Sequence, residues 1–380
     1  MPRLIAIVAL LHAYVGWRIV PDLPWAVAGT WLTAGWLCVS LLLMSSAWLA
    51  RRGHRDRRAD VLAWAGLLAG GLFSSLFVLT LLRDVALGIV ALWNALSMHP
   101  IAFDSVREES ATVVVLLAIV FTLVGLVNAR RLARVRPVDV AIEGLPRALH
   151  GFLIAQISDV HVGATIKRAY VAAIVDAVNA LMPDMIAVTG DLVDGSVRDL
   201  SPHTQPLSRL AARHGSYFVT GNHEYYSGAH AWVSELRRLG LRVLMNEHVV
   251  LEHEGASVVV AGVTDYGAHH FDASHRSDPG KSIAGAPADA GVKVLLAHQP
   301  RSAFAAAEHG FDLQLSGHTH GGQFLPWNFF VRLQQPFTAG LHRLKHLWVY
   351  TSRGTGYWGP PKRLGAPSEI TLVRLVCAEG

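Results

Sequence analysis

The chain has 380 residues, of which 52% are hydrophobic and only 16% are charged, and this composition is too apolar for a single soluble globule. Residues 1–136 carry 13 Lys and Arg against 7 Asp and Glu, a net charge of +6, whereas residues 137–380 carry 20 against 21, a net charge of −1. The second part therefore lacks the basic surface of a nucleic-acid-binding domain, and we expect no nucleic-acid partner. The two cysteines, Cys38 and Cys377, form no disulfide framework.

Four apolar stretches precede residue 130, and they cover residues 4–20, 25–50, 61–82 and 111–129. We interpret them as membrane-spanning helices, the first one short. The first stretch is a weaker candidate for a signal peptide, because no clear small-residue cleavage site follows it. Residues 85–97 are too short to cross a bilayer, and we interpret them as an interfacial helix or as an extension of the third span. Residues 1–136 are therefore predicted to be an all-α transmembrane anchor, and residues 130–137 its linker.

Arginines cluster after the second and fourth predicted spans. The first cluster is Arg51, Arg52, Arg55, Arg57 and Arg58, and the second is Arg130, Arg131, Arg134 and Arg136. By the positive-inside rule both clusters are cytoplasmic, which also places the rest of the chain in the cytoplasm. This side would change if residues 85–97 crossed the membrane.

Residues 137–380 have the pattern of a soluble α/β domain, in which short apolar runs alternate with helical spacing. We predict strands over residues 152–157, 185–189, 217–220, 241–244, 257–262, 292–297, 311–315, 346–351 and 369–376. Helices are predicted over residues 167–181, 206–213 and 232–239. Residues 264–291 are predicted to form a long loop.

Five of these strands are each followed by a short motif of Asp, Asn or His. The motifs are Ser158-Asp159-Val160-His161, Gly190-Asp191-Leu192-Val193-Asp194, Gly221-Asn222-His223-Glu224, His298-Gln299-Pro300 and Gly317-His318-Thr319-His320. Strand ends can meet at one edge of a sheet, so the five loops can converge. A single such motif is commonly only a turn or a helix cap. Five of them in succession, each after an apolar strand, favour a metal site.

The donors in these motifs are oxygen and nitrogen atoms without any thiolate, a set that suits Mn, Fe or Zn. They are too many for one ion that keeps an open position and about right for two. A pair of divalent ions lowers the pKa of a bound water and clamps a phosphate, so that hydroxide attacks phosphorus in line. A remaining histidine can protonate the leaving oxygen. The pattern therefore predicts metal-assisted hydrolysis of a phosphoester.

In these motifs, roughly residues 150–376 resemble the calcineurin-like metallophosphoesterase family. The resemblance implies a four-layer α/β/β/α sandwich over residues 137–380 with a dinuclear metal centre. It assigns Asp159, His161 and His320 to one ion, assigns Asn222, His298 and His318 to the other, and makes Asp191 the bridge. It also implies that His223 contacts the phosphate and assists the leaving group, while Asp194 and Glu224 orient the ligands.

Within the family, Ser352–Gly356 and Ala366–Ile370 are similar to the membrane-anchored bacterial YkuE/YaeI-type subgroup. The resemblance implies an integral protein of the bacterial inner membrane. It also implies a phosphodiester or pyrophosphate substrate, for which a lipid-linked molecule such as UDP-2,3-diacylglucosamine in lipid A biosynthesis is one candidate. A broad-specificity tethered phosphatase, a non-catalytic metal-binding scaffold and a transporter with an accessory domain are the alternatives. The sequence leaves the oligomeric state open.

Several remaining residues allow two interpretations. The aromatic-rich segment 324–341 is either a hydrophobic rim that faces lipid or core packing beneath the metal motif. His269, His270 and His275 in the long loop, and His214, His230, His248 and His253 elsewhere, are interpreted as solvated side chains. Arg353, Lys362 and Arg363 would attract a phosphate, but no sequence pattern brings them to the motifs.

Overall fold

The computed structural model describes residues 2–24, 27–50 and 57–378. These residues form two compact units. The first is helical and contains residues up to 127 together with the short segment 359–362, and the second contains residues 128–358 and 363 onwards. Each unit is described below by itself.

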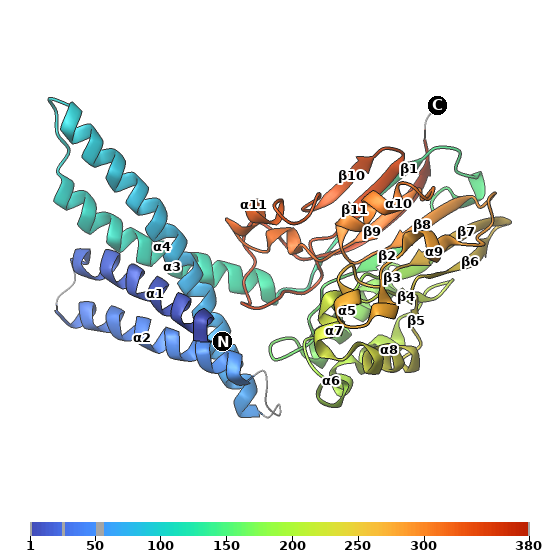
Figure 1. Ribbon diagram of the computed structural model, residues 1–380, viewed down its shortest axis with the longest axis horizontal. Coiled ribbons are helices and arrows are strands. Elements are labelled where there is room, and N and C mark those ends of the chain that lie inside the picture. Colours follow the sequence, from blue (N-terminus) through green and yellow to red (C-terminus); the bar gives the residue numbers. More distant parts are fainter. Residues whose placement is uncertain (1, 25–26, 51–56, 379–380) are drawn as a thin grey trace. The chain divides into compact units, whose positions relative to one another are not determined.

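The helical unit is built from α1 (Pro2–Ile19), α2 (Val27–Ala50), α3 (Arg57–Leu96) and α4 (Phe103–Arg130) (Figure 1). All four are long and apolar enough to cross a membrane. Helix α3 continues through residues 85–96 without a break, so that segment belongs to the same helix as the third predicted span. Residues 25–26 of the second predicted span, and Arg51, Arg52 and Arg55 of the first arginine cluster, lie outside the described residues.

A partly buried ionic network joins α1 and the 3₁₀ helix η1 (Val20–Asp22) to α3 and α4. Arg83 is only 4% exposed; it forms an ion pair with Asp22, and it donates to the carbonyl of Arg107 at 2.9 Å. Arg107 pairs with the same Asp22 carboxylate. Beside them, Arg18 binds Asp84 through two guanidinium nitrogens. Because charged groups are costly in hydrocarbon and these lie next to the ends of three apolar stretches, we interpret the network as the level of one membrane interface.

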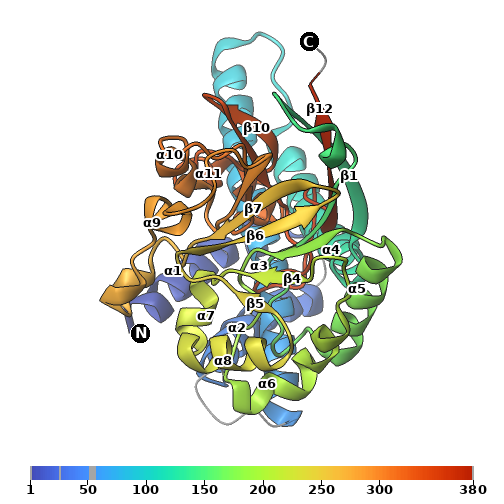
Figure 2. The same cartoon turned by 90° about the vertical axis from the view of Figure 1, so that its right-hand side faces the viewer.

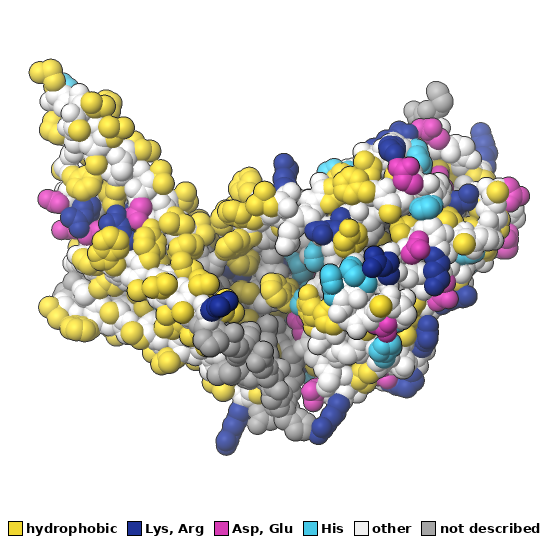
Figure 3. Space-filling model, in the orientation of Figure 1, with side chains coloured by type: hydrophobic (Ala, Val, Ile, Leu, Met, Phe, Trp, Pro, Cys, Tyr) yellow, Lys and Arg dark blue, Asp and Glu magenta, His cyan; other side chains and the backbone are white. Residues whose placement is uncertain are grey.

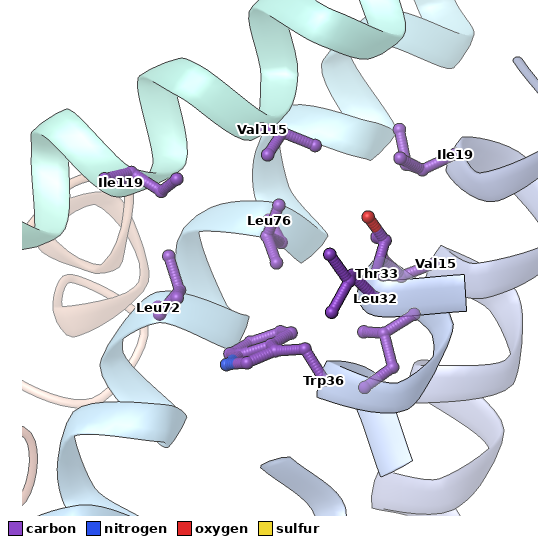
Figure 4. Close-up of a pocket in the computed structure, with 10 residues that line it drawn as sticks. Val15, Ile19, Leu32, Thr33, Trp36, Leu72, Leu76, Val115 and Ile119 are labelled. Carbon is purple, nitrogen blue, oxygen red and sulfur yellow. The ribbon is translucent and has the colours of Figure 1, made fainter. Parts of the chain in front are cut away.

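On the face shown in Figure 3, the side chains of the helical unit are mostly hydrophobic and few are charged, whereas charges of both signs are scattered over the other unit. A cavity of about 360 Å³ opens among the four helices (Figure 4). Its lining is almost wholly apolar and is contributed by Val15, Ile19, Leu32, Thr33, Trp36, Leu37, Leu72, Leu76, Val115 and Ile119. This lining contains no acid, base or metal ligand, so hydrolytic chemistry must lie elsewhere.

The second unit contains two six-stranded sheets. The first has the order β1-β12-β2-β3-β4-β5, with bounds Arg134–Ile142, Glu369–Cys377, Leu153–Ile157, Met185–Val188, Ser216–Phe218 and Arg242–Val243. The second has the order β10-β11-β9-β8-β7-β6, with bounds Gly340–Leu344, Leu347–Thr351, Leu313–Ser316, Val292–Leu296, Ala256–Gly262 and Glu247–His253. Within the first sheet β2, β3, β4 and β5 are parallel neighbours, and within the second β7, β8 and β9 are.

Side-chain alternation along the strands builds four layers. Ile154 of β2 packs with Val258 of β7 in a core between the sheets. Ala155 and Ile157 point to the other face and pack with α5 (Arg168–Ala180) and α8 (Ala229–Arg238). A third core joins Leu295 of β8 to α10 (Ala303–Ala306). Figure 2 shows these helix, sheet, sheet and helix layers in turn, and the predicted four-layer sandwich is confirmed.

The structure differs from the expected elements mainly at the edges. Residues 134–137, which we expected in a linker, begin β1, while β6 and β10 were not predicted as strands. The helix expected over residues 206–213 begins earlier, as α6 (Val197–Thr204) followed by the 3₁₀ helix η3 (Gln205–Arg209). The expected long loop contains η4 (Ala268–His270), η5 (Ala273–His275) and α9 (Pro279–Ile283). Helices α7 (Asn222–Ser227) and α11 (Trp327–Val331) complete the unit.

Candidate metal centre

The five motifs lie at the carboxyl ends of β2, β3, β4, β8 and β9. The first three strands belong to one sheet and the last two to the other, so both sheets supply side chains to the same place. Hydrogen bonds join the loops: Asp159 N donates to the Gly190 carbonyl at 3.0 Å, and His318 N donates to the Asp159 carboxylate at 3.0 Å. The strand ends therefore converge as the sequence predicts.

Asp159, His161 and His320 form one group whose donor atoms face each other. Nε2 of His161 lies 3.0 Å from Nε2 of His320. The same nitrogen of His320 lies 3.5 Å from Oδ1 of Asp159. All three side chains are buried. Such a separation between donor atoms matches ligands that share an ion at roughly 2.0–2.2 Å.

Asp191, His298 and His318 form a second group. Oδ2 of Asp191 is 3.1 Å from Nε2 of His298, which is 3.2 Å from Nδ1 of His318. The other ring nitrogen of His298 lies 2.8 Å from the Thr189 carbonyl, a bond that directs Nε2 into the pocket. Because Oδ2 of Asp191 also lies 3.9 Å from Nε2 of His161, this carboxylate faces both groups.

Asn222 has a buried side-chain oxygen with no hydrogen-bond partner among the described residues. A buried amide oxygen without a partner costs about 1–3 kcal/mol, and a cation is a partner that would remove this cost. Asn222 directly precedes His223, whose backbone N–H donates to Oδ1 of Asp191 at 2.8 Å. Together with the two carboxylates and four imidazoles of the two groups, the Asn222 oxygen makes a donor set that fits divalent ions that prefer nitrogen and oxygen ligands.

The backbone at these positions is strained. Five non-glycine residues of the centre have a positive φ, between 51° and 70°, namely Asp159, His161, Asp191, His318 and His320. Left-handed conformations of such residues cost of order 1–3 kcal/mol each and cluster at functional sites. The neighbouring glycines allow the loops to approach: a Cβ on Gly221 would lie 2.2 Å from Oδ1 of Asp191, and one on Gly317 would lie 2.2 Å from Oδ2 of Asp159.

His223 lies beside the two groups at the start of α7. Its Nδ1 is 2.5 Å from Oδ1 of Asp194, which is also 3.2 Å from Nδ1 of His161. The Nε2 atom of His223 points toward the Asp191 carboxylate at 3.9 Å. Burial alone would lower the pKa of His223, but Asp191 and Asp194 outweigh it and raise that pKa to about 9.

Glu224 is fully buried and ties two loops together. Its carboxylate accepts hydrogen bonds from the backbone N–H groups of Gly221 at 2.7 Å, Asp191 at 3.0 Å and Leu192 at 2.8 Å. Burial, followed by the Asp191 charge, raises the pKa of Glu224 to about 7. Its contacts hold the backbone of Asp191 and that of Gly221, the residue before Asn222.

Other residues lie at the centre although the sequence did not place them there. Arg363 is buried, donates to the His320 carbonyl at 3.2 Å and has Nη2 3.2 Å from the ring Nδ1 of His320. The ring of Trp358 lies 5.7 Å from that of His223, and Gln323 holds Trp358 through two backbone hydrogen bonds of 2.8 Å. Arg353 instead pairs with Glu369. The basic pair at 362–363 was a visible signal, but only the folded loop brings Arg363 to His320.

Two sandwiched sheets with these nitrogen and oxygen donors at a shared edge define the metallophosphoesterase class. Residues 152–322 match the family described as "Calcineurin-like phosphoesterase". An "Uncharacterized metallophosphoesterase" of Campylobacter jejuni is 33% identical over 69% of this chain and 68% of its own length. The chain belongs to the calcineurin-like phosphoesterase family.

Two further relatives bear on the predicted membrane helices and on the predicted YkuE/YaeI-type subgroup. A "Transmembrane protein with metallophosphoesterase domain" of Danio rerio is 36% identical over 72% of this chain. The match spans 64% of that relative's length. The "Uncharacterized metallophosphoesterase YkuE" of Bacillus subtilis is 29% identical over 61% of this chain and 81% of its own length, and the predicted similarity to YkuE is confirmed.

Proposed function

We propose that this protein is a membrane-anchored, metal-dependent phosphoesterase that hydrolyses a phosphodiester or a pyrophosphate. The observation that carries the proposal is the position of Asp191, whose Oδ2 atom faces donor nitrogens of both histidine groups. A carboxylate between two such groups is the arrangement that a pair of ions requires. The family to which the chain belongs and the unpartnered Asn222 oxygen support the same conclusion.

In this proposal Asp159, His161 and His320 hold one divalent ion, while Asn222, His298 and His318 hold another, with Asp191 shared. Two such ions supply an activated water and a clamp for phosphate charge. The protein's own contribution is to fix the donors: Ser158 Oγ donates to Asp159 at 2.6 Å, and Asp194 orients His161 at 3.2 Å. Mn, Fe and Zn all suit these ligands.

His223 is proposed as the acid that protonates the leaving oxygen. Its bond to Asp194 through Nδ1 leaves the Nε2–H free to face the pocket. The Asp191 and Asp194 charges that raise the pKa of His223 to about 9 favour the protonated imidazole, which is the form that an acid needs. The hydrogen bonds of Asp194 and Glu224 assign them to positioning.

We further propose that the substrate is linked to lipid. Helix α11 packs closely against the glycines that follow the metal motif, since a Cβ on Gly322 would lie 2.2 Å from the Cα atom of Asn328 in that helix. Phe329 and Phe330 of α11 and Leu333 just after it are exposed, which favours the apolar rim over the interpretation as core packing. Such an apolar patch on a soluble surface is typical of a lipid or protein contact.

The phosphoesterase unit is proposed to face the cytoplasm of a bacterial inner membrane, since Arg57 and Arg58 begin α3 and Arg130 ends α4. Reporter fusions test this side. A fluorescent protein fused after Gly380 is expected to fluoresce, and alkaline phosphatase inserted after Ser97 is expected to be active. The opposite pattern would reverse the orientation.

The substrate is tested with the full-length chain purified in detergent and supplied with manganese. Release of product is compared for bis(p-nitrophenyl) phosphate, p-nitrophenyl phosphate and UDP-2,3-diacylglucosamine. A strong preference for the lipid nucleotide is expected. Equal or better turnover of the small soluble esters would instead support the broad-specificity phosphatase, and no turnover with both ions bound would support the scaffold.

A further inference from the structure

Three side chains far from the five motifs in sequence also bring their donor atoms together. They are His230, near the start of α8, Asp272, which directly precedes η5, and His275, the last residue of η5; the last two lie in the segment expected to be a loop. Nε2 of His230 lies 3.2 Å from Oδ2 of Asp272, and Nε2 of His275 lies 3.8 Å from the same oxygen. Ligands of a tetrahedral zinc ion at 2.0–2.2 Å are separated by roughly 3.3–3.6 Å, so these separations are close to those of an ion site.

The two chain segments that carry these side chains are held together by packing. Tyr225, Ala229 and Ala268 form a small buried cluster between the α7–α8 region and η4. Phe271 adds to it, with its ring 5.7 Å from that of Tyr225. The separation between His230 and the loop is therefore set by the fold, whether or not an ion is bound.

Two of the three side chains, His275 and Asp272, are also oriented by a second contact. Nδ1 of His275 lies 3.0 Å from the hydroxyl of Tyr225, which leaves Nε2 to face Asp272. Oδ1 of Asp272 accepts from the N–H and hydroxyl of Ser274, at 2.9 and 2.6 Å, which leaves Oδ2 to face both histidines. Histidine ligands of metals are commonly fixed by such a contact on the other ring nitrogen.

We propose that His230, Asp272 and His275 bind a third divalent ion, of the zinc type, separate from the dinuclear centre. Two imidazoles and one carboxylate are a ligand set that zinc uses, with a fourth position for water. The exposure of His230, whose side chain is 78% accessible, leaves room for that water. The proposal depends on none of the residues assigned to hydrolysis.

The bound ion would restrain the loop that carries Asp272 and His275 beside α7. Phe271 follows directly from η4 and contacts Tyr226 with ring centres 5.6 Å apart, and Tyr226 contacts His223 at 5.2 Å. An ion that joins α8 to Asp272 and His275 therefore restrains the aromatic side chains next to His223. Its role is to hold this wall of the pocket in place rather than to take part in the reaction.

The test counts zinc in the full-length chain purified in detergent, after equilibration in a zinc buffer at micromolar free concentration. Elemental analysis is expected to find one ion fewer per chain in His275→Gln and in Asp272→Asn than in the unaltered protein. Asn at 272 keeps an oxygen for the Ser274 N–H, so the local turn is preserved. His269→Gln, a histidine of the same loop outside the cluster, is the control and is expected to lose none.

Proteolysis gives a second measurement that does not depend on the dinuclear centre. Arg276 is exposed next to His275, and zinc is expected to slow trypsin cleavage after it in the unaltered protein and in His269→Gln, but not in His275→Gln. The proposal is overturned if His275→Gln and Asp272→Asn retain as much zinc as the unaltered protein. Failure of the dinuclear assignment is distinguishable, because it would lower the total count while the difference of one ion remained.

Discussion

At the scale of single residues, His223 is the side chain whose role can be separated from metal binding. Its Nδ1 is fixed by Asp194, and its Nε2 faces the pocket without being one of the predicted ligands. We expect His223→Asn to lower kcat about 10²–10⁴-fold with both ions retained. The measurement is kcat beside metal content for the variant and the unaltered protein.

The leaving group provides the internal control for that experiment. A proton matters less to p-nitrophenolate than to a poorly stabilised alkoxide, so the defect of His223→Asn is expected to shrink for p-nitrophenyl esters. A parallel loss of ions and activity, or equal defects for both leaving groups, would contradict the assignment of His223 as the acid.

A second residue-scale prediction concerns stability outside the metal centre. Nε2 of His214 lies 3.0 Å from Nδ1 of His253. Burial, His253 and Arg213 together lower the pKa of His214 in the folded state. Folding therefore favours the neutral imidazole, so its stabilisation is present above the unfolded pKa of about 6.5 and is lost as the pH falls through the lower folded pKa.

Melting temperatures at pH 7.5 and pH 5.5 test this prediction. The unaltered protein is expected to lose more stability between the two pH values than His214→Gln, which cannot be protonated. His309→Gln, an exposed histidine elsewhere in the unit, is expected to behave like the unaltered protein. The same loss in all three proteins would show that His214 does not contribute.

At the scale of the elements, close approach of the β2 and β9 loops depends on Gly317. A Cβ at this position would lie 1.9 Å from Oγ of Ser158 and 2.2 Å from Oδ2 of Asp159. We expect Gly317→Ala to displace Asp159 and to weaken metal affinity about 10–100-fold, measured by titration of the metal-free protein. Gly267→Ala is the control, because its Cβ would meet no atom closer than 3.3 Å. Unchanged metal affinity in Gly317→Ala would contradict the prediction, since the loops could then separate without loss of metal binding.

The ionic network of the helical unit gives another prediction at this scale. Arg83→Leu leaves the buried Asp22 carboxylate with Arg107 alone, and removal of one partner from a buried ion pair costs about 3–5 kcal/mol. We expect a clear fall in the melting temperature of the detergent-purified chain. Arg107→Leu should lower the melting temperature less, because the Arg107 side chain is 42% exposed. An equal fall in both variants would show that the buried pair of Arg83 and Asp22 is not the main stabilising contact of this network.

The elements that the sequence predicts well are those buried on both sides. Strands β2, β3 and β8 appear as continuous apolar runs because each lies inside a sheet with packing on both faces. The missed strands β1, β6 and β10 all lie at sheet edges. Strand β1 is stabilised by parallel pairing with β12 and by an ion pair between Asp139 and Arg374. The β1 segment is charged and contains Pro137, and its sequence does not show that β12 and Arg374 lie beside it in the fold.

The candidate centre was predictable for a related reason. Every proposed ligand lies within four residues of the end of an apolar strand, so the end of the strand places it. Arg363 and Trp358 lie on an irregular loop after β11, and only tertiary contacts bring them to His320 and His223. The same applies to His230 and His275, which we interpreted as solvated: a loop of unknown path hides their proximity to Asp272.

At the scale of the whole molecule, the chain combines an apolar helical unit with a phosphoesterase unit whose surface is charged (Figure 3). The cavity within the helices has no group that can hydrolyse an ester, whereas the sandwich edge gathers carboxylates and imidazoles. We therefore assign the chemistry to the sandwich and membrane attachment to the helices. The exposed aromatic side chains of α11 lie in the phosphoesterase unit and next to its metal motif, and they are the basis of our proposal that the substrate is linked to lipid.

The most direct test of this account measures whether hydrolysis follows occupancy of the centre by two ions. The full-length His275→Gln protein, which removes the proposed third site, is stripped with a chelator and titrated with manganese while turnover of bis(p-nitrophenyl) phosphate and bound metal are recorded. Activity is expected to be absent without metal and to rise to its maximum as two ions bind. The Asp191→Asn variant is expected to lose both the activity and the binding of the two ions. Turnover that persists without metal, or a chain that binds two ions and hydrolyses none of the phosphoesters, would contradict the account.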